Sequence, residues 1–107
     1  MMFEDMAWTS GVLERQAGEA RAIATLSLEA RSKLAMQRNR DKGTWEKYRP
    51  YELIQLLQKE QMELAAAVVA VDWNDEACVD AVARECADVA GFCAFILDNA
   101  RRGVWKR

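Results

Sequence analysis

The scarcity of proline is the feature that most constrains how this chain can fold. Pro50 is the only proline, and five glycines are spread over 107 residues. Downstream of Pro50 the apolar residues recur at intervals of three, four and seven, which is the spacing of one face of an α-helix. No segment alternates polar and apolar residues with the period of two that a half-buried strand requires. The sequence therefore predicts an all-α fold.

Two helical pieces are expected in the N-terminal part of the chain. The first covers Ser10 to Leu26, within an N-terminal extension or extra helix over residues 1–26. Ser27 is a candidate cap for a second piece that runs to about Arg40. The sequence leaves open whether these pieces form one bent helix or two.

Two longer helices are expected after the polar segment 39–49. The first begins at Pro50, where a missing N–H costs nothing, and extends to Val71. A tight turn over 72–75 leads to a second helix that ends near Ala100, ahead of Gly103. So short a turn makes its two helices antiparallel neighbours. The expected architecture is an antiparallel helical bundle of about four helices.

Size and charge narrow the class of protein further. A chain of 107 residues fits a single domain, with residues 28–102 as its helical core. A domain of this size buries a limited share of its surface, so homo-oligomerisation is expected to complete the core. The net charge of −2 argues against a nucleic-acid binder. No run of 18 apolar residues and no secretory signal are present, so no membrane span and a cytoplasmic location are expected.

The chain has no histidine, which removes His-based acid–base chemistry and Ser-His or Cys-His nucleophile pairs. Its three cysteines, Cys78, Cys86 and Cys93, lie too far apart on one helix for a disulfide. They also lack the spacing of a zinc site. Chemistry in this chain is therefore left to carboxylates, cations or a metal ion.

Acidic residues stand in the apolar stripes of both long helices. At about 100° per residue, Glu60 falls in the middle of the apolar face of its helix and Glu63 at the edge of that face. Glu85 and Asp88 repeat this arrangement on the next helix. Positions three apart share one face, so each pair can reach a common ligand.

Ionised carboxylates on an apolar face need compensation, because burying one without a partner costs several kcal/mol. The apolar faces of the two helices offer no Lys or Arg. A divalent cation with a preference for oxygen ligands, Mg²⁺ or alternatively Mn²⁺, would satisfy all four acids. The alternative is that Arg84 or Lys59 swings round to pair with them.

The segments QKEQMELAAAV and ARECADVAGF resemble the all-α nucleoside triphosphate pyrophosphohydrolase superfamily, specifically its MazG-like family. Its signature is ExxE, a gap and then ExxD; here a gap of 21 residues, 64 to 84, separates the two pairs. The segment NRDKGTW is similar to one that precedes the first motif in small MazG-like proteins. Lys59 and Gly91 depart from the family pattern, which often has Glu and Asn at these positions.

The resemblance implies an enzyme that converts a nucleoside triphosphate to the monophosphate and pyrophosphate. It assigns Glu60, Glu63, Glu85 and Asp88 as catalytic metal ligands for Mg²⁺. It also implies a homodimer or homotetramer. Two alternatives stay open: a helical nucleotide-binding or scaffold module without turnover, and a phosphoribosyl-ATP pyrophosphatase-like enzyme.

A triphosphate substrate also needs cations and a surface for its base. The candidate substrate-binding residues are Arg40, Lys42, Trp45, Lys47, Asn99 and Arg102, with Arg101 beside the last of these. Trp45 either stacks on a base or packs its loop onto the helices. Asn99 either reaches the phosphates or caps the end of its helix.

Overall fold

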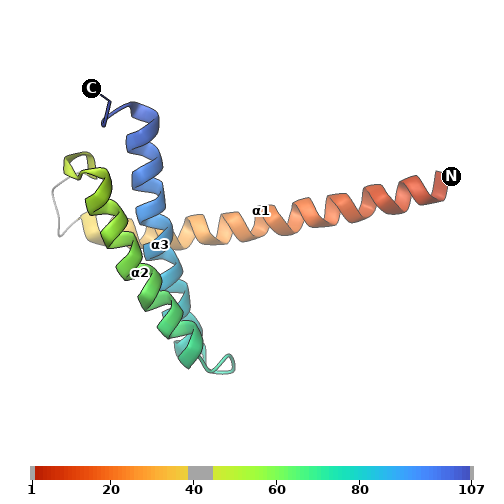
Figure 1. Cartoon of the computed structure of the whole chain (residues 1–107). Coiled ribbons are helices and arrows are strands. Elements are labelled where there is room, and N and C mark those ends of the chain that lie inside the picture. Colours follow the sequence, from red (N-terminus) through yellow and green to blue (C-terminus); the bar gives the residue numbers. More distant parts are fainter. Residues whose placement is uncertain (1, 39–44, 107) are drawn as a thin grey trace.

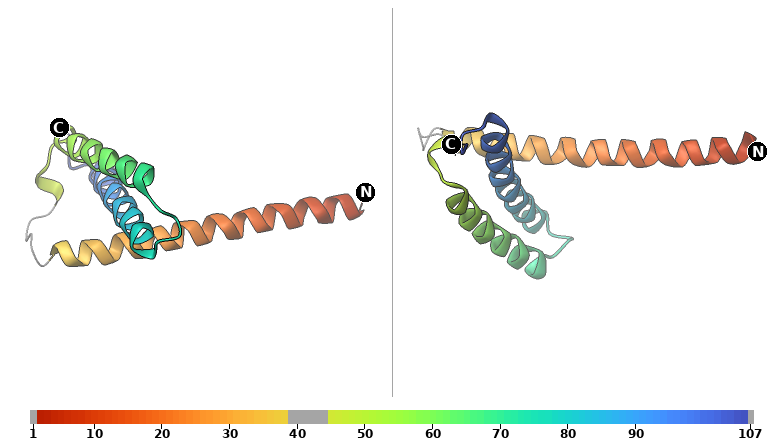
Figure 2. Two further views of the ribbon diagram at one scale, coloured as in Figure 1. Left: turned by 90° about the horizontal axis from the view of Figure 1, so that it is seen from below. Right: turned by 45° about the horizontal axis from the view of Figure 1, so that its top comes forward.

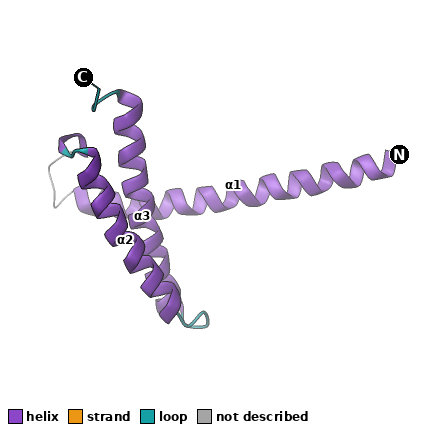
Figure 3. Cartoon of the chain, viewed as in Figure 1, coloured by secondary structure: helices purple, strands orange, loops and turns teal. Residues whose placement is uncertain are grey.

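The chain is all-helical, as predicted (Figures 1 and 3). The structure, a computed structural model, describes residues 2–38 and 45–106, with residues 2–9, 37 and 38 described by their backbone alone. Within these ranges lie three α-helices and one short 3₁₀ helix, and no strand. They are α1 (Met2–Arg38), η1 (Trp45–Lys47), α2 (Pro50–Ala70) and α3 (Glu76–Arg102). No described helix is long and apolar enough to cross a membrane.

The two N-terminal pieces left open by the sequence form one continuous helix. α1 has 37 residues, and Ser27 lies inside it rather than at a cap. At 1.5 Å per residue such a helix is about 55 Å long, close to the 57 Å longest dimension of the chain. Of the bundle of about four α-helices expected, the described residues provide three.

The helical pair α2–α3 is built as predicted. Pro50 is the first residue of α2, and the Glu52 carboxylate accepts a hydrogen bond from the Arg49 N–H at 3.0 Å. Asp75 caps α3 by accepting from the Ala77 N–H at 3.0 Å. Gly103 ends α3 with φ of 71°, a left-handed conformation that glycine adopts without a Cβ penalty.

The central element of the fold is α3, because α1, η1 and α2 each pack against it. α2 runs antiparallel to α3, and α1 crosses α3 with its C-terminal half (Figure 1). The N-terminal half of α1 projects away from the other helices, and the two further views in Figure 2 agree on this.

The 3₁₀ helix η1 is attached to the C-terminal part of α3. The Trp45 ring stacks on Phe95, and its Nε1 donates to Asp98 at 2.8 Å. The Asn99 side-chain amide donates to the Trp45 carbonyl at 3.0 Å. Trp105 Nε1 donates to the Tyr48 carbonyl at 2.9 Å. These contacts connect residues 50 or more positions apart in the sequence.

The core of the single chain is small. Only Leu53, Ala87, Gly91 and Asn99 are buried among the residues whose side chains are described. A packed domain of about 100 residues normally buries many more. Much of the apolar surface therefore stays exposed in one copy of the chain.

The most exposed apolar side chains on α2 lie on the side that faces away from α3. Val69 is 88% exposed and Met62 is 74% exposed. We define the outer α2 face as the uncharged exposed residues Tyr51, Ile54, Gln55, Gln58, Gln61, Met62, Ala65, Ala66, Val68 and Val69. The surface side of a helix in a monomer normally carries charged residues, but the exposed charged residues of α2, Lys59 and Glu63, lie to one side of this face.

Candidate metal centre

Three of the four predicted carboxylates converge between α2 and α3. One oxygen each from Glu60, Glu85 and Asp88 lies within 4.8 Å of the others. Glu60 comes from the middle of α2, and the other two come from adjacent turns of α3. The convergence follows from helical periodicity, which turns all three toward the interface of an antiparallel pair.

Two carboxylate oxygens of this group have no hydrogen-bond partner among the described residues. Glu60 Oε2 and Glu85 Oε2 are both buried and unpaired. Buried polar atoms are paired in the great majority of cases, so two unpaired carboxylate oxygens in one place are unusual. They leave acceptor capacity in two of the three converging side chains.

The electrostatic state of Glu60 reflects this crowding. Its pKa is raised from 4.5 to about 7, chiefly because burial disfavours the charged form. A hydrogen bond with Glu63 and the negative charges of Asp88, Glu63 and Glu85 raise the pKa further. The folded chain thus holds a proton on Glu60 at pH values where an ordinary glutamate has lost it.

The fourth predicted ligand, Glu63, lies at the rim. Its side chain is exposed and is not one of the three converging groups. Its contact is the hydrogen bond with Glu60. This placement agrees with the edge position expected for Glu63, which lies three residues from Glu60 and so about 60° round the helix from it.

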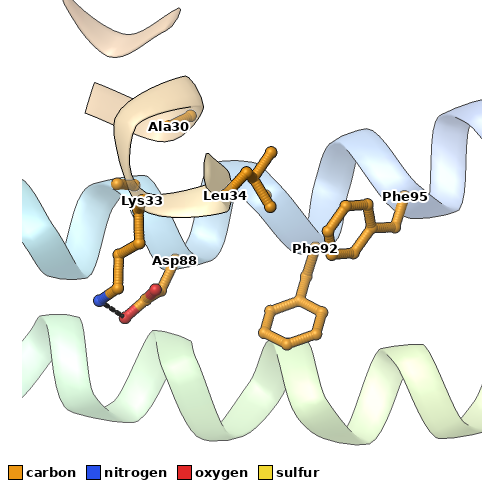
Figure 4. Close-up of a pocket in the computed structure, with 8 residues that line it drawn as sticks. Ala30, Lys33, Leu34, Asp88, Phe92 and Phe95 are labelled. Carbon is orange, nitrogen blue, oxygen red and sulfur yellow. Dashed lines mark hydrogen bonds and ion pairs between the residues drawn. The ribbon is translucent and has the colours of Figure 1, made fainter. Parts of the chain in front are cut away.

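A cation that sequence reasoning missed lies beside the cluster. Lys33 Nζ is 2.6 Å from Asp88 Oδ2, and the two side chains point toward α2 (Figure 4). The side chains of Lys33 and Asp88 are 29% and 13% exposed. Arg84 and Lys59, the cations considered from the sequence, are exposed. The pairing residue belongs to α1, whose position no local pattern reveals.

A small pocket adjoins this ion pair between α1 and α3 (Figure 4). Its walls are mostly apolar, with the ion pair at one end. It is lined by Ala30, Lys33, Leu34, Ala87, Asp88, Gly91, Phe92 and Phe95. Gly91 is buried where α1 passes α3, and Leu34 is the nearest side chain to its absent Cβ.

Four of the predicted substrate-binding residues contact other residues of the chain. Trp45 has one ring face on Phe95, with the centroids 4.5 Å apart, as in the packing alternative. Asn99 is fully buried and bonds the Trp45 carbonyl. Arg102 pairs with Glu46 and Asp98. Lys47 lies over the Tyr48 ring.

Two further candidates, Arg40 and Lys42, fall outside the described residues. Arg101 is exposed near the end of α3. Substrate contacts by any of these residues stay predictions. The cysteines Cys78, Cys86 and Cys93 are free thiols, as expected.

No family model, no curated protein and no solved structure matches this chain. The resemblance to the MazG-like family therefore rests on the four acids, their spacing and the short segments around them.

Proposed function

We propose that this chain is a Mg²⁺-dependent nucleoside triphosphate pyrophosphohydrolase, which converts a ribo- or deoxyribonucleoside triphosphate to the monophosphate and pyrophosphate. A role in clearing the nucleotide pool fits this reaction. The observation that carries the proposal is the convergence of Glu60, Glu85 and Asp88, two of which have a buried, unpaired carboxylate oxygen.

The donor set fits a hard divalent cation. Oxygens that share one Mg²⁺ lie about 3 to 4 Å apart, so small side-chain rotations would bring the three oxygens from within 4.8 Å to that spacing. Glu63 is one turn from Glu60 and is the expected fourth ligand. Mn²⁺ has similar ligand preferences and is the expected substitute. When bound, such an ion neutralises phosphate charge and lowers the pKa of a bound water.

The residues around the cluster have complementary roles in this proposal. Lys33 adds a positive charge on the side of α1. Leu34 and Phe92, in the wall of the adjoining pocket, limit access of water from that side. A lower local polarity strengthens the electrostatic interactions of the carboxylates.

The proposal includes a homodimer, or a homotetramer built from such dimers. The outer α2 face is uncharged along the helix, and the single chain buries few residues. A second copy of this chain is the partner that suits this face, because a two-fold axis would place the same uncharged surface on itself. Pairing would cover Met62 and Val69, which are among the most exposed apolar side chains.

Pyrophosphate release from a panel of ribo- and deoxyribonucleoside triphosphates, with and without Mg²⁺, tests the proposal. The variant Asp88→Asn should lower the rate about 100-fold, since it removes the charge of a metal ligand. Asp80→Asn makes the same change at an exposed position of the same helix and should retain activity. Equal activity of the two variants would refute the assigned site.

The same panel separates the alternatives. Nucleotide binding without pyrophosphate release would support a binding or scaffold module. Release from phosphoribosyl-ATP alone would support a phosphoribosyl-ATP pyrophosphatase-like enzyme. No contact among the described residues favours a ribosyl group, so the general nucleoside triphosphate is the substrate class proposed.

A further inference from the structure

Lys33 is the cation that the described residues place against the carboxylate cluster, and it comes from outside the two helices that carry the acids. Its Nζ donates to Asp88 Oδ2 at 2.6 Å, a short charge-assisted hydrogen bond. Ala30 and Leu34, on the same side of α1, line the pocket against Ala87 and Gly91 of α3. This packing fixes the backbone of Lys33 beside Asp88.

A single ammonium leaves the cluster undercompensated. Lys33 bonds Asp88, whereas one buried oxygen each of Glu60 and Glu85 stays unpaired among the described residues. Asp88 is also one of the three groups whose oxygens converge. An ammonium and a divalent cation would therefore compete for the same carboxylate and repel each other at close range.

We propose that Lys33 is the resident counter-ion of the metal-free site, and that it transfers from Asp88 to the phosphates of the substrate when a divalent cation binds. This inference rests on the proposed function. It makes Lys33 a substrate-binding residue and gives α1, which lies outside the acidic motifs, a part in the site.

The position of Lys33 supports the transfer. Its stem is held by the packing of α1, so its ammonium can swing away from Asp88 but remains near the cluster. The phosphates of a substrate held by the carboxylates through a metal ion must also lie there. Lysine is a compact charge with three rotatable donors, well suited to phosphate oxygens. The side chain is 29% exposed, so it can be reached from solvent.

The transfer predicts that one substitution, Lys33→Met, strengthens metal binding and weakens substrate binding. Lys33→Met keeps the apolar stem and removes the competing charge. Without nucleotide, it should bind Mn²⁺ about fivefold more tightly, the equivalent of one partly exposed ion pair. With nucleotide, its KM should rise about tenfold, because one phosphate contact is lost. A purely structural role of Lys33 would leave Mn²⁺ binding unchanged or weaken it.

The experiment is a Mn²⁺ titration of the full chain without nucleotide, followed by electron paramagnetic resonance, beside pyrophosphate-release kinetics. Lys59→Met is the matched control, because it removes a lysine next to Glu60 that is exposed on α2. Lys33→Arg should restore the KM of the wild type at least in part. If Lys33→Met loses helicity by circular dichroism, Lys33→Gln replaces it.

Tighter Mn²⁺ binding by Lys33→Met than by Lys59→Met, together with a raised KM that Lys33→Arg partly restores, supports the inference. Tighter Mn²⁺ binding by Lys33→Met in a protein that releases no pyrophosphate would overturn the transfer to substrate phosphates and the proposed enzyme, and would leave Lys33 as a counter-ion only. Equal Mn²⁺ binding by the two variants overturns the inference, even if pyrophosphate release by the wild type supports the enzyme. Absence of Mn²⁺ binding in the wild type and in all variants overturns both.

Discussion

The rings of Trp45 and Phe95 stack with their centroids 4.5 Å apart and their planes 14° from parallel. Phe95 lies on α3, and Trp45 opens the 3₁₀ helix that precedes α2. Phe92 meets Phe95 edge-on at 5.8 Å, so the aromatic contact continues toward the pocket beside Asp88. This stack joins the segment before α2 to the helix that carries two of the acids.

Because of this stack, Trp45 should matter for stability. Trp45→Ala should lower the free energy of unfolding by about 2 kcal/mol, since it removes a partly buried aromatic contact and the bond to Asp98. Urea denaturation followed by circular dichroism measures this. Trp73→Ala, at a residue that is 62% exposed, is the control and should change stability little. Similar losses in both variants would contradict the structural role of Trp45.

Gly91 within α3 and Gly103 directly after α3 should respond oppositely to substitution by alanine. A Cβ at Gly91 would meet Leu34 at 3.9 Å, an ordinary contact. Gly91→Ala should therefore stabilise the helix by up to about 1 kcal/mol, in spite of its burial. Gly103→Ala should destabilise by about 1 kcal/mol, because φ of 71° disfavours a side chain. Thermal unfolding of both variants tests this prediction. A lower melting temperature for Gly91→Ala would mean that α1 packs too closely against α3 to admit a Cβ at this position.

The stability of the metal-free protein should depend on pH through Glu60. Its pKa is about 7 in the folded chain and 4.5 as the ordinary value, so the folded state binds the extra proton between these limits. Stability should therefore fall as pH rises from about 4.5 to about 7 and level off above. Glu60→Gln should flatten this part of the profile, as measured by melting temperature without metal. If the melting temperature of Glu60→Gln falls with pH as steeply as that of the wild type, groups other than Glu60 cause the pH dependence.

Mg²⁺ should restore the stability that the metal-free protein loses as pH rises. Above pH 7 the ionised carboxylates repel one another, and a ligand that binds only the folded state raises its melting temperature. Chelation should lower the melting temperature of the wild type again. The difference in melting temperature between magnesium and chelator should shrink in Glu60→Gln, which has one charged ligand fewer.

The association state should depend on the outer α2 face. Met62→Glu places a charge in the middle of this face and should weaken a dimer about 30-fold or more, as for a central interface residue. Met36→Glu makes the same change on α1, at a residue that is 64% exposed. Sedimentation equilibrium of both variants tests the prediction. A monomeric wild type at high concentration would refute the dimer itself.

The paired helices and their acids could be predicted from the sequence because both depend on local rules. Proline at the first position, an Asp cap and a left-handed glycine set the ends of α2 and α3. The 3.6-residue period then fixes which side chains face the partner helix. Glu60, Glu85 and Asp88 meet as that period requires.

Contacts between distant segments could not be predicted in this way. Lys33 meets Asp88 across 55 positions, and the Asn99 side chain bonds Trp45 across 54. Such contacts depend on how α1 and η1 dock on α3, which is decided by packing and not by periodicity. The sequence left the role of Trp45 open for the same reason, since an aromatic next to basic residues suits either a ligand or a packing contact.

The projection of α1 beyond α3 has a consequence for its dynamics. A lone helix in water is only marginally stable, and the side chains described for residues 10–29 of α1 are nearly all exposed, whereas Ala30, Lys33 and Leu34 pack against α3. The backbone amides of residues 10–29 should exchange with deuterium much faster than those around Leu34. Slow exchange in the projecting part would reveal that another molecule shields it.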